Sequence, residues 1–317
     1  MIAAPRSQFI STVASNTFLC REHYRLVVRA GGFPPTDPGQ FVQICCRPMD
    51  VDDGVETDRV WREDRFPDLL GADVRAPNAV LRRPFSLAGR RDTQAGVELE
   101  IIHRVVGVGT DWLSRLAPGD QVHLLGPLGN RFALPPEDVP ALLVGGGVGI
   151  PPMLYLAQRL AHRAAVAFCG ATSRDLVPLT LRKSSGGAPE GAVRPALLVD
   201  EFARHGIPSV ITTDDGSFGF RGFVTQALER YLGEMPAGVR PVIYTCGPEP
   251  MMKRVAEIAS ARELECQIAV ERAMACGMGT CQSCVIRVRR PSGGGRDWVY
   301  RLACTDGPIF RGGELLW

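Results

Sequence analysis

The first part of the chain carries short apolar runs divided by glycine and proline. These runs cover residues 24–30, 40–45, 97–106 and 121–125. Short strands with turn residues between them predict an antiparallel barrel or sandwich. The pattern disappears between residues 47 and 80, where acidic residues and arginines dominate. This segment is interpreted either as a solvated surface excursion or as a partner-docking loop that interrupts the barrel.

From Pro140 onward, apolar strands alternate with helical patterns. The expected strands are 141–144, 164–169, 208–213, 241–245 and 266–270, and the expected helices are 152–162, 223–232 and 249–262. Strands joined by helical crossovers predict a parallel five-stranded α/β domain. A glycine- and serine-rich loop is expected at 182–195. We expect a multidomain β plus α/β protein with a barrel at 1–138, the α/β domain at 139–264 and a small C-terminal unit at 265–317.

Composition and charge narrow the class of protein. Hydrophobic residues make up 45% of the chain, charged residues 22%, and the formal net charge is +2. This balance excludes extensive disorder and gives no global attraction to nucleic acid or to an anionic membrane. The uncharged stretch at 141–158 is broken by glycines and prolines, so no membrane span is expected. No secretory leader is recognised, so we expect a cytoplasmic protein with reduced thiols.

The most specific pattern is a cysteine cluster near the C-terminus. Its members are Cys276, Cys281, Cys284 and Cys304. Three closely spaced thiolates and a distant fourth match the plant-type ligand spacing of a [2Fe–2S] cluster. A structural zinc site is the alternative, although zinc sites usually combine two pairs of closely spaced cysteines. The other six of the ten cysteines are interpreted as small buried hydrophobes, with Cys246 as the exception.

A glycine loop and a second strand-end motif indicate a nucleotide site. The loop residues are Gly145, Gly146, Gly147, Gly149 and Pro151, and the second motif is Cys246, Gly247 and Pro248. A glycine loop between a strand and a helix lets the backbone approach a pyrophosphate, and such ligands bind at the carboxyl ends of parallel strands. Cys246 is the one thiol expected beside a nicotinamide ring.

Two further segments in the barrel suggest a site for a phosphate and an aromatic ring. Their residues are Arg83, Pro84, Phe85, Ser86, Ile102, His103, Arg104, Gly109 and Thr110. From the residue types alone, Arg83 could equally be a surface arginine, and His103 could be an ordinary buried histidine of a strand.

With these motifs in this order, the chain resembles the ferredoxin–NADP reductase superfamily. More narrowly, it resembles the electron-transfer subunits of class 1B dihydroorotate dehydrogenases. The resemblance implies an FAD-binding barrel, an NAD-binding α/β domain and a [2Fe–2S] domain. It places residues 83–86 and 102–104 against the flavin, where tyrosine is more usual than His103, and residues 109 and 110 near the pyrophosphate. Residues 145–151 and 246–248 would flank the nicotinamide nucleotide, and the four cysteines would hold the cluster.

The resemblance also implies a relay in which a partner subunit bearing FMN oxidises dihydroorotate to orotate in pyrimidine biosynthesis. Single electrons would pass through the cluster to FAD, and a hydride would pass to NAD⁺, with NADP⁺ as the alternative. The family implies a heterotetramer of two catalytic and two electron-transfer subunits. Two other hypotheses remain open, namely an NAD(P)H reductase that stands alone or serves another complex, and a zinc-stabilised nucleotide-binding module without enzymatic activity.

Overall fold

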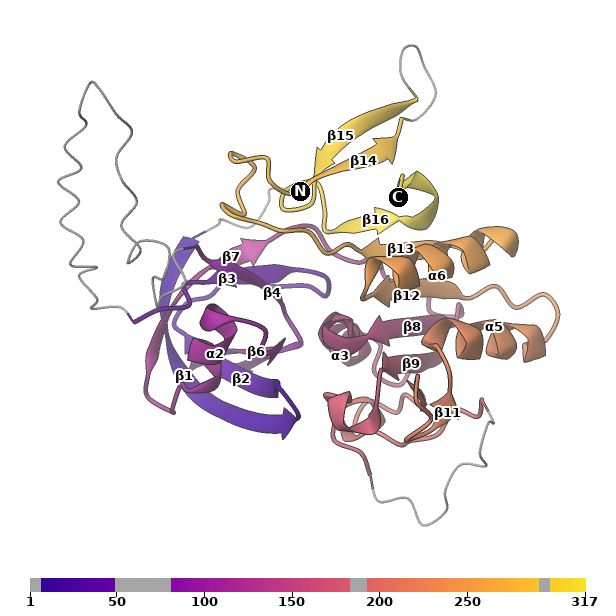
Figure 1. Ribbon diagram of the computed structural model, residues 1–317, viewed down its shortest axis with the longest axis horizontal. Coiled ribbons are helices and arrows are strands. Elements are labelled where there is room, and N and C mark those ends of the chain that lie inside the picture. Colours follow the sequence, from indigo (N-terminus) through magenta and orange to yellow (C-terminus); the bar gives the residue numbers. More distant parts are fainter. Residues whose placement is uncertain (1–6, 49–80, 183–192, 291–296) are drawn as a thin grey trace.

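The computed structural model describes residues 7–48, 81–182, 193–290 and 297–317, and Figure 1 shows two sheets side by side with a small hairpin beside them. The first sheet is antiparallel, with strand order β4-β3-β7-β1-β2-β6-β5. Its strands are β1 (Ser7–Cys20), β2 (His23–Ala30), β3 (Phe41–Ile44), β4 (Arg83–Ser86), β5 (Gly89–Thr93), β6 (Gly96–Arg104) and β7 (Gln121–Leu128), and helix α2 (Val108–Ser114) follows β6.

The predicted antiparallel sheet is confirmed, and it curls into a half-barrel with one buried face. Leu26, Val28 and Ala30 are fully buried along β2, because alternate side chains of a strand point to the same face. Strand β1 was not predicted, because its polar residues break the apolar pattern. This strand pairs with both β2 and β7, so the partners on either side stabilise it.

The second sheet has strand order β11-β10-β9-β8-β12-β13-β16 and contains the five predicted parallel strands. Its strands are β8 (Ala141–Gly146), β9 (Ala165–Ala171), β10 (Ser209–Thr213), β11 (Phe220–Arg221), β12 (Val242–Cys246), β13 (Cys266–Ala269) and β16 (Ile309–Arg311). The helical elements are η1 (Gly147–Gly149), α3 (Ile150–Arg159), η2 (Arg174–Leu176), α4 (Asp200–Ala203), α5 (Val224–Glu234) and α6 (Glu249–Ala261). Strand β8 is buried along its whole length, as expected for a central parallel strand.

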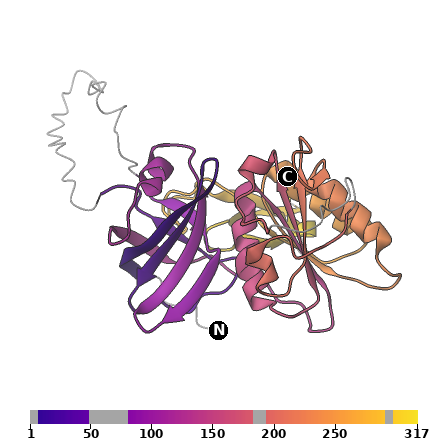
Figure 2. The same ribbon diagram turned by 90° about the horizontal axis from the view of Figure 1, so that it is seen from below.

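Helix α3 lies between the two sheets, and α5 and α6 cover the opposite face of the parallel sheet (Figure 2). Several contacts across this interface hold the sheets together. Tyr155 on α3 is buried and donates a hydrogen bond to the Thr36 carbonyl at 2.7 Å, and the Arg25 guanidinium pairs with the buried carboxylate of Glu201. These buried polar contacts fix the relative position of the two sheets.

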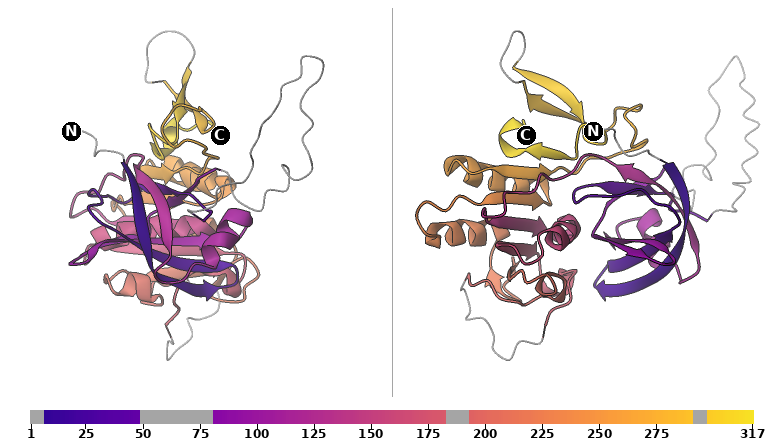
Figure 3. Two further views of the ribbon diagram at one scale, coloured as in Figure 1. Left: turned by 90° about the vertical axis from the view of Figure 1, so that its left-hand side faces the viewer. Right: turned by 180° about the vertical axis from the view of Figure 1, so that it is seen from behind.

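The C-terminal residues form the hairpin of β14 (Val285–Arg289) and β15 (Trp298–Leu302), then β16 and the short helix η3 (Gly312–Glu314). The hairpin projects from the rest of the molecule, as both views of Figure 3 show. Strand β16 runs antiparallel to β13 and extends the second sheet. Strand β13 pairs with β12, although the predicted boundaries assign it to the C-terminal unit. The limits of the three units remain predictions.

The uncharged stretch at 141–158 contains β8, η1 and most of α3. Within the described ranges, no helix is long and apolar enough to cross a membrane. The predicted excursion at 47–80 and the loop at 182–195 lie almost wholly outside the described residues.

Candidate functional site

A cleft of about 800 Å³ opens where β4, β6 and α2 approach the second sheet. Every barrel residue predicted to contact a flavin lines this cleft. These residues are Arg83, Pro84, Phe85, Ser86, Ile102, His103, Arg104, Gly109 and Thr110. Strand β4 pairs with β3, which brings residues 83–86 to the wall formed by β6. Tertiary structure therefore joins two segments that the sequence could only suggest separately.

His103 is the most unusual polar group of the cleft. Its side chain is only 2% exposed, its ring stacks on Tyr24 at 5.8 Å, and it meets Phe85 edge-on at 6.2 Å. Neither ring nitrogen has a hydrogen-bond partner among the described residues. Burial, with nearby His23 as a smaller cause, lowers the pKa of His103 to about 4. The imidazole is therefore neutral at pH 7, with one donor and one acceptor to offer a ligand of the cleft.

Thr110 shapes the turn that leads into α2. Its hydroxyl oxygen accepts hydrogen bonds from the backbone N–H groups of Val106 at 2.9 Å and Gly107 at 3.2 Å. Gly107 is exposed, and a Cβ atom there would meet nothing within 4 Å. The backbone at Gly107 is therefore accessible from the cleft, so a large cofactor could approach it closely.

A second cavity of about 530 Å³ lies at the carboxyl ends of the parallel strands. Gly146, Gly147 and Pro248 line it, as expected for a site between the two strand-end motifs. Pro151 instead faces the flavin cleft. Arg104, Val148 and Glu271 line both cavities, so the two spaces adjoin. A flavin and a nicotinamide nucleotide placed in them would meet at this shared wall.

The glycine loop packs directly on the second motif. A Cβ atom at Gly149 would lie 2.2 Å from the Cys246 carbonyl oxygen and 2.5 Å from the Gly247 nitrogen. Close backbone packing therefore requires glycine at position 149. Cys246 is 3% exposed, and burial raises the pKa of its thiol well above the ordinary value. The residues that line this cavity do not include Gly145, Gly149, Cys246 or Gly247, and the nicotinamide-facing role of Cys246 remains a prediction.

Several charged or ionisable residues of the second cavity were not predicted as site residues. They are His23, Asp214, Arg254 and Glu271. Burial raises the pKa of Glu271, which stands at the wall shared by both cavities. Asp214 follows β10 directly, and a carboxylate after a strand of a parallel sheet was the sequence signal that could have identified it.

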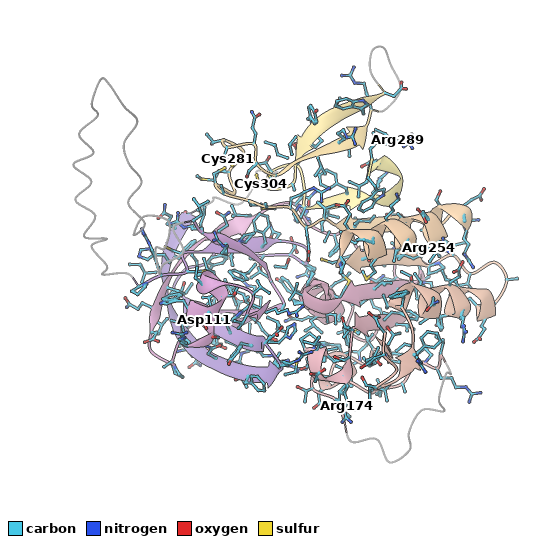
Figure 4. All side chains as sticks on the ribbon, viewed as in Figure 1. Asp111, Arg174, Arg254, Cys281, Arg289 and Cys304 are labelled. Atoms are coloured by element: carbon cyan, nitrogen blue, oxygen red, sulfur yellow. The ribbon has the colours of Figure 1, made fainter. Side chains whose placement is uncertain are left out.

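The four predicted cluster cysteines come from one loop and from the turn after β15, and Figure 4 labels Cys281 and Cys304. The Cys276 sulfur accepts hydrogen bonds from the backbone N–H groups of Met278 and Cys281, both at 3.4 Å. Cys304 interacts with Cys284, which is also buried. Backbone N–H groups directed at a ligand sulfur are what a [2Fe–2S] cluster requires of its loop.

This cysteine loop packs on the barrel. The fully buried Gln43 of β3 donates a hydrogen bond to the Ala275 carbonyl at 3.3 Å, and Gly277 packs on the Gln43 side chain. Among the described residues, no three His, Cys, Asp or Glu side chains surround a single point as ligands of one metal ion. In a [2Fe–2S] cluster the four thiolates bind two irons, so the ligand sulfur atoms lie further apart than the ligands of a single zinc ion.

The fold and the adjoining cavities define an FAD- and NAD-linked electron-transfer reductase with a C-terminal iron–sulfur domain. A family model described as the iron–sulfur cluster binding domain of dihydroorotate dehydrogenase B matches residues 271–316. Among solved structures, an NADH-dependent reduced ferredoxin–NADP oxidoreductase matches with a TM-score of 0.68 and 25% identity, covering 97% of this chain and 90% of that one. A cytochrome P450 reductase from Amycolatopsis shares the fold, with a TM-score of 0.57, 24% identity and coverage of 83% and 68%.

Two curated relatives carry the same name, dihydroorotate dehydrogenase B (NAD(+)), electron transfer subunit. The protein of Caldanaerobacter subterraneus subsp. tengcongensis is 32% identical over 305 residues, which is 96% of each chain. That of Geobacillus thermodenitrificans is 38% identical over 76% of this chain and 82% of its own. The chain belongs to the family of dihydroorotate dehydrogenase B electron transfer subunits, which confirms the resemblance inferred from its motifs.

Proposed function

We propose that this chain passes electrons between a catalytic dihydroorotate dehydrogenase subunit that bears FMN and NAD⁺, by way of a [2Fe–2S] cluster and FAD. The observation that carries the proposal is the continuity of three sites. The flavin cleft shares Arg104, Val148 and Glu271 with the nucleotide cavity. Its wall also includes residues 271–274, and the first cluster cysteine, Cys276, follows two residues later.

The protein's own groups position and enclose the cofactors. When bound, the flavin exchanges a hydride with the nicotinamide and single electrons with the cluster. Arg83 offers a charge-assisted hydrogen bond to a flavin phosphate. His103 offers one donor and one acceptor beside Phe85, whose ring would pack against a flat ligand.

In the nucleotide cavity, a Cβ atom at Gly147 would meet nothing within 4 Å, so its open backbone would let a pyrophosphate approach, whereas Gly146 packs on Met251. Val148 lies where the two cavities meet and Pro151 lines the flavin cleft, so both apolar side chains would limit access of water to the bound rings. No side chain of the site is needed as a general base, because the transferred groups are electrons and a hydride. A zinc-stabilised nucleotide-binding module without enzymatic activity does not explain why the barrel motifs line a second large cleft.

Three finer statements are part of the proposal. The partner subunit carries FMN, two copies of each subunit form a heterotetramer, and the complex works in the cytoplasm. The family name supports a catalytic partner, because an electron transfer subunit needs a source of electrons. The full-length likeness to the ferredoxin–NADP oxidoreductase supports a second candidate, in which the same relay serves a different partner.

Isolation without oxygen tests the proposal. The chain should copurify with an FMN-containing dehydrogenase and contain FAD, iron and acid-labile sulfide. The complex should reduce NAD⁺ with dihydroorotate as the electron donor. A complex with another partner and no activity on dihydroorotate would support the second candidate. A protein with zinc and without flavin or iron would overturn both candidates.

A further inference from the structure

The outer face of the β14–β15 hairpin carries an unusual set of side chains. Residues directly opposite each other in an antiparallel pair share a face, and the register pairs Val285 with Leu302, Arg287 with Tyr300 and Arg289 with Trp298. We call these six residues the hairpin face. It combines two arginines and two aromatic rings with two aliphatic side chains, and arginine, tyrosine and tryptophan are enriched at the hot spots of protein interfaces.

The opposite face of the hairpin is covered by the protein itself. Ile286 and Val288 are each 5% exposed, and Val288 forms a β-bridge with Leu315. Among the described residues the hairpin face is more open, with Tyr300 63% exposed and Val285 40% exposed, although Leu302 at its base packs against the core. A two-stranded hairpin is marginally stable when isolated, so the packed inner face anchors it while the outer face remains available.

The two arginines of the hairpin face have no carboxylate partner among the residues that the structure describes. Neither Arg287 nor Arg289 forms an ion pair with a carboxylate in the described part of the chain, whereas neighbouring Arg272 pairs with Glu249 at 2.7 Å. The Arg287 guanidinium lies over the Trp298 ring at 5.9 Å, and the Trp298 and Tyr300 rings meet edge-on at 4.9 Å. The Arg287 contact holds one cation beside apolar surface, and Arg289 lies on the same face of the hairpin, an arrangement complementary to carboxylates set among apolar side chains.

The hairpin face begins at the cluster ligands. Val285 follows Cys284 directly, and Leu302 lies two residues before Cys304. Arg287 is three residues beyond Cys284, a distance of about 10 Å along a strand. A groove of about 350 Å³, lined among others by Arg272, Tyr300 and Trp317, runs beside it. A protein bound here would lie next to the cysteines.

We propose that the hairpin face is the docking surface for the catalytic partner subunit, which meets it with a carboxylate-bearing surface. This inference rests on the proposed function, because it assumes that electrons enter through the cluster from a second protein. It assigns to this hairpin a contact role in addition to linking the last two cluster ligands.

The test uses the complete FAD- and cluster-loaded chain with the FMN-containing dehydrogenase that copurifies with the wild type. Arg287→Glu should weaken their association by at least about tenfold at low salt, because it reverses a charge at a desolvated contact. Lys253→Glu is the matched control, since it makes the same charge change on an exposed residue of α6. It should leave the dissociation constant within about twofold. Arg289→Glu, further from the cysteines, is a second variant.

Two measurements separate docking from damage to the cofactor sites. Visible absorption of the cluster and NADH-driven reduction of ferricyanide should match the wild type in all three variants. If Arg287→Glu and Arg289→Glu both bind the dehydrogenase as tightly as Lys253→Glu, the docking surface lies elsewhere. If the wild-type chain itself binds no FMN-containing dehydrogenase, the proposed function fails, and the docking inference fails with it.

Discussion

The close packing of Gly149 on the second strand-end motif leads to a quantitative prediction. In Gly149→Ala, the new methyl group would lie 2.2 Å from the Cys246 carbonyl oxygen, whereas real Cβ contacts are not shorter than 3.0 Å. The two segments must therefore separate by about 0.8 Å, which is the difference between the 3.0 Å limit and the 2.2 Å contact. The Cα atom of Gly149 belongs to the backbone of η1, and the Cys246 carbonyl belongs to the backbone at the end of β12, so neither can yield by a side-chain rotation.

This separation should affect both stability and hydride transfer. Overpacking of a well-packed region typically costs about 1–3 kcal/mol. A displacement of about 1 Å in a reacting pair can cost about 100-fold in rate, so we expect a decrease of tenfold to 100-fold, roughly, in flavin reduction by NADH. Anaerobic stopped-flow measurement of flavin bleaching gives the rate, and urea unfolding gives the stability.

Gly31→Ala is the control for Gly149→Ala, because a Cβ atom at Gly31 would meet nothing within 4 Å and its φ is not in the left-handed region. This variant should keep the wild-type rate. The packing argument is refuted if Gly149→Ala reduces its flavin at the wild-type rate and unfolds at the wild-type urea concentration.

Three further predictions concern the cluster, the buried histidine and the nucleotide. Cys281→Ser should abolish electron exchange with the partner but spare flavin reduction by NADH, measured separately by orotate formation and by flavin bleaching. Because burial lowers the pKa of His103 to about 4, the unfolded chain binds an extra proton between about pH 4 and 6.5. The stability of the apoprotein should therefore fall with acidification over this window, by about 3 kcal/mol more in the wild type than in His103→Phe, as measured by urea unfolding. Asp214→Asn should weaken the preference for NADH over NADPH by about tenfold, measured as a ratio of kcat/KM values, since a carboxylate repels a ribose 2′-phosphate.

Each of these predictions has an outcome that would contradict it. Loss of flavin reduction in Cys281→Ser with FAD still bound would contradict the order of the relay. Equal pH dependence of stability in the wild type and His103→Phe would mean that His103 is not buried as a neutral group. Asp215→Asn is the control for Asp214, because Ser217 already holds the Asp215 carboxylate through its N–H at 2.9 Å and its hydroxyl at 2.7 Å. Equal effects of the two substitutions would remove Asp214 from the specificity argument.

The sequence by itself determined that the chain forms an antiparallel and a parallel sheet, and it identified the motifs from which the site is built. The pattern of apolar residues along a strand shows which of its faces are buried. Strands of the half-barrel are buried on one face and alternate, whereas the strand at 141–146 is buried on both faces and is continuously apolar. The cysteine spacing reports a local ligand geometry, so the cluster motif could be read without tertiary information. Strand β1 was missed because its stability comes from pairing with β2 and β7, which a local pattern does not record.

Only the tertiary structure decided which motifs meet. Residues 83–86 and 102–104 form one wall because β4, β3 and the rest of the barrel sheet bring them together. The structure placed Cys246 beneath the glycine loop and brought Asp214 and Glu271 to the cavity walls. It also left Arg287 and Arg289 without carboxylate partners in the described ranges. Sequence patterns encode which side chains are buried, whereas the contacts between distant segments depend on how whole sheets pack against each other.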